Sequence, residues 1–488
     1  MGNEFQKTTE NEPEIWIHEE KWIKVVKDFK RATEVLEKNR IALDEHLIQL
    51  DESRKVVSDE PRNRALAEQA ELYTREILDE VERLDPRFKS TFLKSGSFYD
   101  DAKVGLPDEY DYMAKLVLLS KPGIGRAVPT KLGFARIILE DEKAKELWEQ
   151  FLCEDSDEDT LEVFKSVLSI SKLQEEFRSL VMKAIKSVKM PSKWQRDPCP
   201  EQHGPCAMLE FLVDDFLPEG QLYISIDLAP CITYPNHKDI EFPFYRYLDI
   251  ENSFATMLTQ IVAEQYNVLL VPFIDDGVKL VKKTTCIYRQ SFREQMRVSF
   301  SMVEKDIFAN FACNSIEKRV LRLLKILRDI HLKDDEKRQE WEDPVPDEPP
   351  STKMENITTI EQYVPPKHPK WFWDYVKGKV PYKEGELKIE KDNASVSDLL
   401  QTYVFKSLFF YTKLFSTDEE RWKPGNLSGT LLKCLDDLFN VYSVPNAALP
   451  NFFFDGYTGK KPNYYKQKKI LMGMFKLARS LQVYVDEA

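Results

Sequence analysis

Apolar residues recur at helical spacing in the N-terminal part of the chain. They alternate with charged residues from Ile15 to about Leu50, and again from Pro61 to about Pro86. Positions three and four residues apart lie on one face of a helix, so each segment is predicted to form a helix with one buried face. The same kind of pattern predicts a long helix from about Thr160 to Lys189.

Shorter segments alternate apolar and polar residues, which is typical of β-strands with one buried face. The clearest pair is Leu209–Val213 and Leu222–Leu228, with the turn signal Pro218-Glu219-Gly220 between them. This pattern predicts a β-hairpin. In its second strand the alternate apolar residues share one face and Asp227 lies on the other, so a carboxylate is expected at the end of a largely buried strand.

The C-terminal part has a different composition. Residues 332–381 are rich in proline and charge and predict an extended insertion, whereas residues 395–485 are mostly helical and aromatic in pattern. We therefore expect a mixed α/β fold in three parts. These are an N-terminal tail and helix (1–55), a lobe with a twisted sheet (56–290) and a helical C-terminal lobe (291–488).

Composition narrows the cellular setting. The chain is 42% hydrophobic, but no apolar run reaches the length of about 18 residues that a membrane span requires. The N-terminus shows no signal-peptide core, and the seven cysteines are scattered and odd in number. We expect a cytoplasmic protein with reduced thiols and no membrane association.

The most informative segment contains Gly96-Ser97 and, after a loop, Glu109-Tyr110-Asp111. Alternate residues of a strand share a face, so the two carboxylates are expected to project together, about 7 Å apart along the backbone. With Asp227 as a third ligand they can bind Mg²⁺, which prefers oxygen and leaves positions open for phosphate. Gly96 allows close approach to a triphosphate, and Ser97 offers it a hydroxyl and an N–H.

Each of these features has a simpler explanation when taken alone. A Gly-Ser pair is commonly a turn, Glu-x-Asp is commonly a solvated strand edge, and Asp227 could belong to a strand-end turn. Their order and spacing together favour a nucleotide site.

With these motifs the chain resembles the nucleotidyltransferases cyclic GMP-AMP synthase (cGAS) and the cGAS-like receptors. Gly96–Lys115 resembles their Gly-Ser and Glu-x-Asp signature, and Arg297–Ser301 resembles their Arg-x-Ser-Phe-Ser strand. Later family elements have counterparts at Thr402-Tyr403, Lys406-Ser407 and Pro450–Phe453. The resemblance covers roughly residues 60–480 and implies a bilobal nucleotidyltransferase fold, with nucleotides bound between a sheet lobe and a helical lobe.

The resemblance gives roles to further residues. Arg297, Ser299 and Ser301 alternate with apolar residues, so they would form a polar strand face suited to a base. Lys325 would approach a nucleotide phosphate. Tyr403 would stack on a base, with an ordinary core position as the alternative.

Lys318 and Arg322 share a helix face with Lys325, opposite a stripe of apolar residues. For Lys318 and Arg322 we interpret this face as solvated surface charge. Only at Lys325 does the resemblance favour a function.

The chain departs from mammalian cGAS in its metal-binding insertion. The stretch after the Arg-x-Ser-Phe-Ser strand contains Cys313 as its one cysteine, so the zinc insertion that helps to dock DNA is absent. Cys199, His203 and Cys206 form a possible three-ligand set, but reduced cysteines in a proline-rich loop are the preferred interpretation, and zinc is not expected.

The resemblance implies a Mg²⁺-dependent enzyme, with Mn²⁺ as a substitute, that joins two nucleoside triphosphates such as ATP and GTP into a cyclic dinucleotide. Ala229 stands where cGAS has a base-contacting threonine, so the bases of the product stay open. The implied activator is double-stranded RNA rather than DNA, and the product would act on a STING-type receptor in innate immunity. The alternatives are a catalytically silent scaffold and a linear oligonucleotide synthase.

The activator would need a local basic patch, because the net charge is −13 and nucleic-acid affinity comes largely from Lys and Arg. One candidate is the group Lys186, Lys189 and Lys193 at the end of the predicted 160–189 helix, where the first two share a face. An ordinary solvated surface is the alternative.

Overall fold

The computed structural model describes residues 20–129, 133–156, 163–196, 206–218, 220–234, 253–264, 268–272, 295–331, 400–416, 419–443, 452 and 464–486. The chain divides into two compact units. The sheet unit comprises residues 51–322 and 452–456, and the helical unit comprises residues 1–50, 323–451 and 457–488. The boundaries fall inside helices α2 (Arg40–Arg54) and α9 (Ile316–His331). Among the described helices, none combines the length and apolar character needed to cross a membrane.

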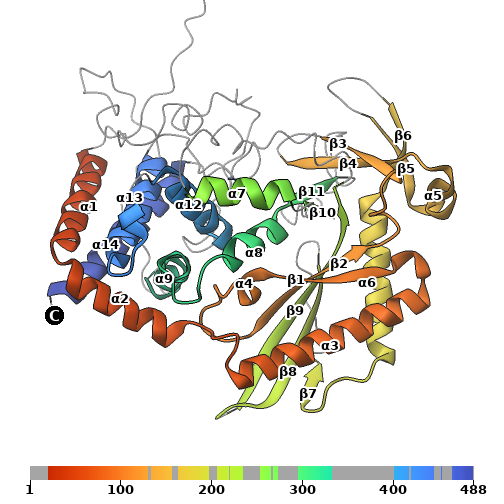
Figure 1. Ribbon diagram of the computed structural model, residues 1–488, viewed down its shortest axis with the longest axis horizontal. Coiled ribbons are helices and arrows are strands. Elements are labelled where there is room, and N and C mark those ends of the chain that lie inside the picture. Colours follow the sequence, from red (N-terminus) through yellow and green to blue (C-terminus); the bar gives the residue numbers. More distant parts are fainter. Residues whose placement is uncertain are drawn as a thin grey trace, which may run out of the picture. The chain divides into compact units, whose positions relative to one another are not determined.

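The sheet unit is built on one twisted mixed sheet (Figure 1). Within the described residues its main path runs β1-β2-β9-β10-β11-β4-β6-β5, with β3 on β4, β8 on β9 and β7 on β8. The strands are β1 (Ser90–Ser95), β2 (Glu109–Leu116), β3 (Gly125–Pro129), β4 (Phe134–Leu139), β5 (Leu152–Ser156), β6 (Val163–Leu168), β7 (Trp194–Arg196), β8 (Ala207–Leu217), β9 (Gly220–Thr233), β10 (Leu269–Pro272) and β11 (Met296–Ser299).

The pairing of β2 with β9 is parallel, whereas the other described strand pairs are antiparallel. β8 and β9 form the hairpin that the alternating pattern predicts, which confirms that prediction. Parallel neighbours bring the same ends of two strands to one edge of the sheet. The register pairs Glu109, at the start of β2, with Ser225 in the middle of β9. Side chains from sequence positions far apart therefore meet there.

Helix α3 (Pro61–Leu84) packs on β1 and β2, and on α6 (Ile170–Ser187), which packs on β8 and β10. α3 begins where the sequence predicts, because Pro61 suits the first helical turn and the Glu60 carboxylate accepts a hydrogen bond from the Asn63 N–H. Its buried face includes Tyr73 and Ile77. The remaining helices of this unit are α4 (Gly96–Tyr99), α5 (Glu142–Leu147), α7 (Ser253–Glu264) and α8 (Ser301–Ala309), with short 3₁₀ turns at Pro86–Phe88 and Glu149–Phe151.

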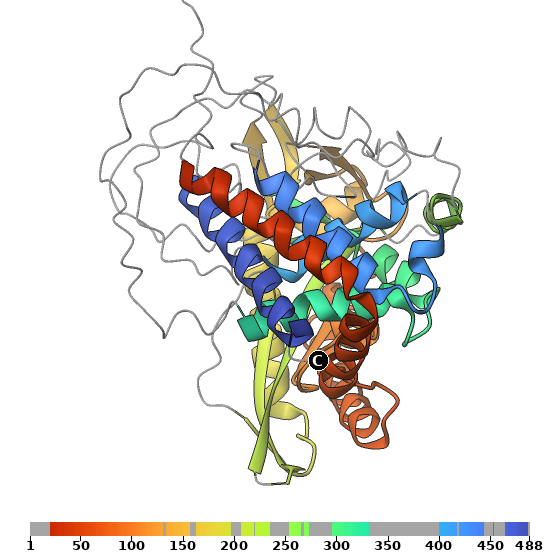
Figure 2. The same ribbon diagram turned by 90° about the vertical axis from the view of Figure 1, so that its left-hand side faces the viewer.

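The helical unit contains α1 (Glu20–Lys38), α12 (Thr402–Phe415), α13 (Leu427–Ser443) and α14 (Tyr464–Asp486), with a 3₁₀ turn at Glu419–Trp422. α1, α13 and α14 pack side by side, as Figure 2 shows. The rings of Phe29 and Phe439 stack with their centroids 3.9 Å apart. The helical pattern expected for the C-terminal part is confirmed where the structure describes it.

The sequence predictions differ from the structure in two segments. The predicted 160–189 helix is wrong in its first part, because Val163–Leu168 pairs with β5 and β4 as strand β6, and Ser169 is extended. The single helix predicted up to about Leu50 is two helices, since α1 ends at Lys38 and α2 begins at Arg40. The predicted insertion at 332–381 lies outside the described residues. The mixed α/β fold class is confirmed.

Candidate active site

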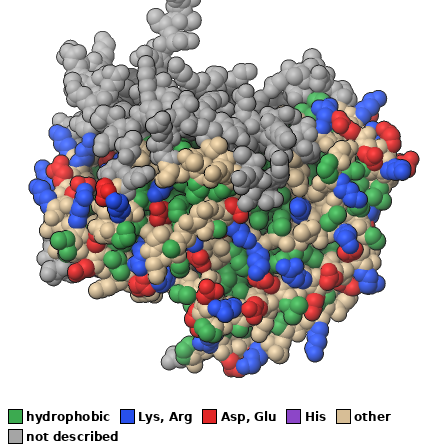
Figure 3. All heavy atoms as spheres, viewed as in Figure 1, with side chains coloured by type: hydrophobic (Ala, Val, Ile, Leu, Met, Phe, Trp, Pro, Cys, Tyr) green, Lys and Arg blue, Asp and Glu red, His purple; other side chains and the backbone are tan. Residues whose placement is uncertain are grey.

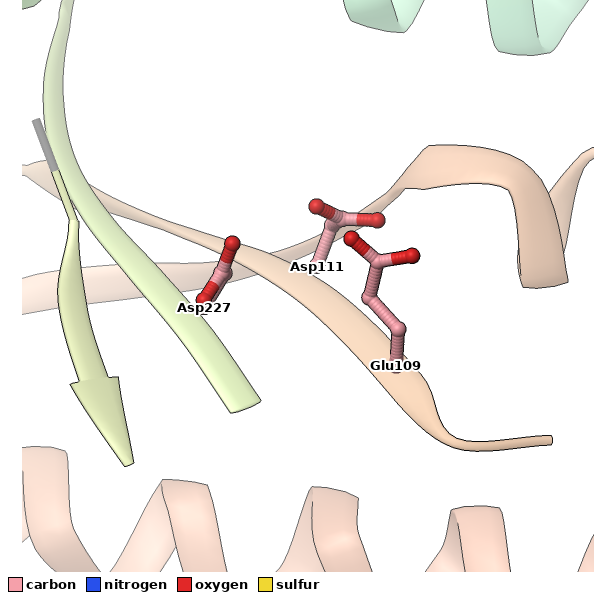
Figure 4. A group of neighbouring side chains, drawn as sticks. All are labelled: Glu109, Asp111 and Asp227. Atoms are coloured by element: carbon pink, nitrogen blue, oxygen red, sulfur yellow. The ribbon is translucent and has the colours of Figure 1, made fainter. Parts of the chain in front are cut away.

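Three carboxylates converge where β2 lies beside β9. The parallel register places Asp111 opposite Asp227, with Glu109 near the beginning of β2. One ligand atom from each of the three lies within 4.8 Å of the other two (Figure 4). All three residues are partly exposed, so the group is open to a ligand.

Alternation along the strands explains why these carboxylates share a face. In β2 the neighbouring Tyr110 and Tyr112 are buried, at 0% and 1% exposure, and occupy the opposite face. The Tyr112 hydroxyl lies 2.8 Å from that of Tyr99, which in turn donates to Glu71 of α3 at 3.1 Å. The tyrosine face therefore packs toward α3, and the carboxylates project from the other side of the sheet.

Gly96 is held directly against this group. Its φ is +83°, a left-handed conformation that favours glycine, and a Cβ built on it would lie 1.9 Å from Oδ2 of Asp111. The preceding residue, Ser95, pairs with Asp111 across β1 and β2. Ser97 follows on α4, partly exposed, and its carbonyl accepts a hydrogen bond from Ala102. The structure thus places the Gly-Ser pair beside the carboxylates.

A lysine that sequence reasoning missed lies at the same place. The Lys103 ammonium is 2.9 Å from Oε2 of Glu109 and 2.8 Å from Oδ1 of Asp108. Burial disfavours the charged form of Lys103, but the two carboxylates outweigh that cost and hold its pKa above the ordinary value. A lysine in a loop looks like a solvated residue in sequence, so no pattern could have singled it out.

Cys206 also lies near the carboxylates, just before β8. Burial raises the pKa of its thiol, and the charges of Asp227 and Asp111 raise it further, so the thiol is protonated at neutral pH. Cys199 and His203, the other members of the possible zinc set, lie outside the described residues.

The residues expected to contact a base lie at the end of β11. Arg297 is exposed between two buried apolar neighbours, as the alternation predicts. The strand ends at Ser299, and Ser301 is the first residue of α8, so the predicted strand face is shorter than expected. The two serine hydroxyls are 3.1 Å apart, and that of Ser301 lies 3.5 Å from the sulfur of Met113. Met113 shares the face of Asp111, which places Ser301 over that face of the sheet.

The interpretation of Lys318 and Arg322 as solvated charge is wrong. Their exposures are 3% and 0%. Lys318 donates to Asp101 at 2.8 Å, and Arg322 makes two hydrogen bonds to Asp51, at 2.6 and 2.7 Å. These cations are buried because carboxylates distant in sequence neutralise them.

Lys325 and Tyr403 belong to the helical unit. Lys325 is 4% exposed on α9, whereas Tyr403 is partly exposed in the first turn of α12. The carboxylates, Gly96, Ser97 and the β11 residues all belong to the sheet unit. The sequence-predicted site residues therefore come from both units.

The basic candidates lie at the end of α6. Lys186 is in its last turn, but the helix ends at Ser187, so the helical face expected for Lys186 and Lys189 does not continue to Lys189. Lys193 has a left-handed φ of +73° and forms an ion pair with Asp215 at 3.0 Å. All three lysines are exposed. On the face in Figure 3, basic and acidic side chains are interspersed.

Comparison with known protein families assigns this part of the chain. Residues 98–310 match the family model described as the Mab-21 protein nucleotidyltransferase domain, a family that includes cGAS-like proteins. This part of the chain is similar to a Mab-21 nucleotidyltransferase domain. The match supports a transferase of the EC 2.7.7 type, a class that acts on nucleoside triphosphates. The match contains all three carboxylates and the β11 residues, and it begins just after Gly96 and Ser97.

The matched segment contains a ligand set that fits magnesium. Nucleotidyltransferases usually use Mg²⁺, which binds oxygen ligands at about 2.0–2.1 Å and retains positions for substrate phosphates. Ligands of one such ion lie within about 4 Å of one another, close to the 4.8 Å limit within which Glu109, Asp111 and Asp227 already lie.

Proposed function

We propose that the protein is a ligand-activated nucleotidyltransferase that joins two nucleoside triphosphates into a cyclic dinucleotide. The observation that carries this proposal is the carboxylate group of Glu109, Asp111 and Asp227, with Gly96 against it, inside a Mab-21 nucleotidyltransferase domain. A catalytically silent scaffold would have no need of a glycine that is fitted to a metal-ligand carboxylate.

The carboxylates would hold two Mg²⁺ ions. When bound, these ions neutralise the triphosphate charge and stabilise the departing pyrophosphate. Asp227 would help the acceptor hydroxyl to lose its proton, and the hydroxyl oxygen would bond to the α-phosphorus of the donor nucleotide. The bond from that phosphorus to pyrophosphate breaks, and a second transfer closes the ring.

Other residues would bind the nucleotides. Gly96 and Ser97 would face the triphosphate, and Arg297 has the exposure needed to hydrogen-bond a base edge. Ser299 and Ser301 would contribute hydroxyls from the same side. On the strength of the family resemblance, Lys325 would contact a nucleotide phosphate and Tyr403 would stack on a base.

The activator would be double-stranded RNA, since the zinc insertion associated with DNA docking is absent from the sequence. Lys186, Lys189 and Lys193 are exposed and could contact phosphates. The product would act on a STING-type receptor, and the protein would work in the cytoplasm as part of antiviral defence.

The test is product analysis with four α-³²P-labelled triphosphates, with and without double-stranded RNA or DNA. A cyclic dinucleotide has no terminal phosphate, so phosphatase should change neither its label nor its chromatographic mobility. A linear product has a 5′-triphosphate, and its removal by phosphatase releases the 5′ label and shifts the mobility. We expect a phosphatase-resistant dinucleotide that increases with RNA and is absent from a Glu109→Gln, Asp111→Asn double variant. A linear product would favour an oligonucleotide synthase, and no product under any condition would favour a scaffold.

A further inference from the structure

The Lys103 ammonium is more enclosed than the carboxylate it contacts. The Lys103 side chain is 12% exposed, whereas the Glu109 side chain is 46% exposed. The positive charge thus sits on the inner side of Glu109, and the carboxylate opens to solvent. The ammonium bridges Glu109 and Asp108, both of which lie close to it along the chain.

Backbone hydrogen bonds join the chain around Lys103 to the segment that precedes α3. The Val56 N–H donates to the Lys103 carbonyl at 3.1 Å, and the Gly105 N–H donates to the Arg54 carbonyl at 2.8 Å. Lys55 and Val104 form an isolated antiparallel bridge between these contacts. These contacts fix the backbone that carries Lys103, and this fixed backbone places the ammonium beside Glu109.

Asp101 fixes the other end of this loop. It has a left-handed φ of +54°, and its carboxylate accepts hydrogen bonds from Ser58 at 2.7 Å and from Lys318 at 2.8 Å. Its carbonyl accepts from the buried guanidinium of Arg322 at 2.9 Å. A strained residue persists where its surroundings determine its conformation. The buried cations of α9 thus hold the segment that carries Lys103.

Charge explains what the lysine does at this position. Three carboxylates within 4.8 Å repel one another when no cation is between them. One ammonium offsets part of that charge, and it takes an oxygen of Glu109 that a divalent ion would also attract. A cation that enters the group must share or displace it.

We propose that Lys103 is an internal counter-ion that competes with the divalent metal for Glu109. Lys103 keeps the affinity for the divalent metal low in the absence of nucleotide. When a triphosphate binds, its negative charge raises that affinity, and the metal is retained. This inference rests on the metal site of the proposed function. A lysine that only oriented Glu109 would have the opposite effect, because its removal would weaken metal binding.

The experiment measures Mn²⁺ binding to the full chain without nucleotide, from the electron paramagnetic resonance signal of free Mn²⁺. Lys103→Met should bind Mn²⁺ about tenfold more tightly, the effect of removing one unit charge about 5 Å from a divalent ion in a solvated site. Lys103→Arg should bind like the wild type. Lys55→Met is the matched control, because Lys55 is 10% exposed and pairs with Glu52 and Asn314 instead.

Equal or weaker Mn²⁺ binding by a folded Lys103→Met would overturn the inference and leave the metal site intact. A wild type whose Mn²⁺ binding is absent, or is unaffected by Asp227→Asn, would overturn the metal site as well. A second measurement needs no substitution. Acylation of Lys103, followed by mass spectrometry, should increase when Mn²⁺ is added, with exposed Lys186 as the internal reference, and unchanged labelling of Lys103 would contradict competition.

Discussion

Gly96 determines where the Asp111 carboxylate can lie. Its left-handed backbone and its contact with Oδ2 of Asp111 are separate reasons for glycine at this position. The first costs any other residue roughly 1–2 kcal/mol of strain. The second excludes a side chain altogether unless the carboxylate moves.

We predict that Gly96→Ala lowers nucleotidyl transfer on the order of 10²-fold, because a displacement of about 1 Å at a catalytic group has effects of that size. Gly123→Ala is the control, since Gly123 has a φ of +79° but a Cβ added there would meet nothing within 4 Å. Both variants should lose thermal stability to backbone strain, measured by calorimetry, with a larger loss in Gly96→Ala because of its contact with Asp111, and only Gly96→Ala should lose activity and Mn²⁺ binding. Equal loss of activity in both would mean that backbone strain, and not contact with Asp111, sets the requirement.

The residues of this site differ in how far sequence could predict them. Glu109, Asp111 and Asp227 follow from strand alternation and the order of the motifs, and the parallel register brings them together. The role of Lys103 could not be predicted from the sequence, because it depends on contacts that only the folded loop creates. Lys318 and Arg322 were misjudged for a related reason. Arg322 meets Asp51 at a separation of 271 residues, which a helical pattern does not contain.

At the scale of elements, strand alternation predicted the hairpin, and the helical spacing of apolar residues after Pro61 predicted the start of α3. The prediction of one helix over residues 160–189 was wrong in its first part, because Val163–Leu168 is apolar enough to continue a helical stripe. This segment is a strand because it pairs with β5 and β4. The end of α6 matters more for function. It leaves Lys186 on the helix and Lys189 and Lys193 beyond it, so the three lysines form a local cluster and not a helical face.

We predict that changing Lys186, Lys189 and Lys193 to Glu abolishes stimulation by double-stranded RNA and flattens its salt dependence, while Mn²⁺-supported basal activity persists. The measurement is the rate of product formation against RNA at several salt concentrations. Lys121, Lys143 and Lys172 are exposed lysines elsewhere on the sheet unit, and their triple Glu variant is the charge-matched control. A normal RNA response in the Lys186, Lys189 and Lys193 triple variant would mean that these lysines are ordinary solvated surface.

At the scale of the whole molecule, the two units divide the candidate residues by chemistry. The sheet unit holds the carboxylates, the Gly-Ser pair and the β11 residues, and the helical unit holds Lys325 and Tyr403. The fold class followed from the sequence pattern, but the unit boundaries inside α2 and α9 did not, since a continuous amphipathic helix gives no signal where its packing partners change.

The central claim is that Asp227, together with Glu109 and Asp111, binds the metal that makes this domain a catalyst. The most direct test is pyrophosphate release from nucleoside triphosphates with Mg²⁺ or Mn²⁺, comparing Asp227→Asn with the wild type. Asp79→Asn, which removes an exposed carboxylate from α3, is the control. The account predicts a loss on the order of 10²–10³-fold for Asp227→Asn, the effect of removing one charge-stabilising group, with the fold intact and Asp79→Asn unaffected. Wild-type pyrophosphate release by Asp227→Asn with either metal would contradict it.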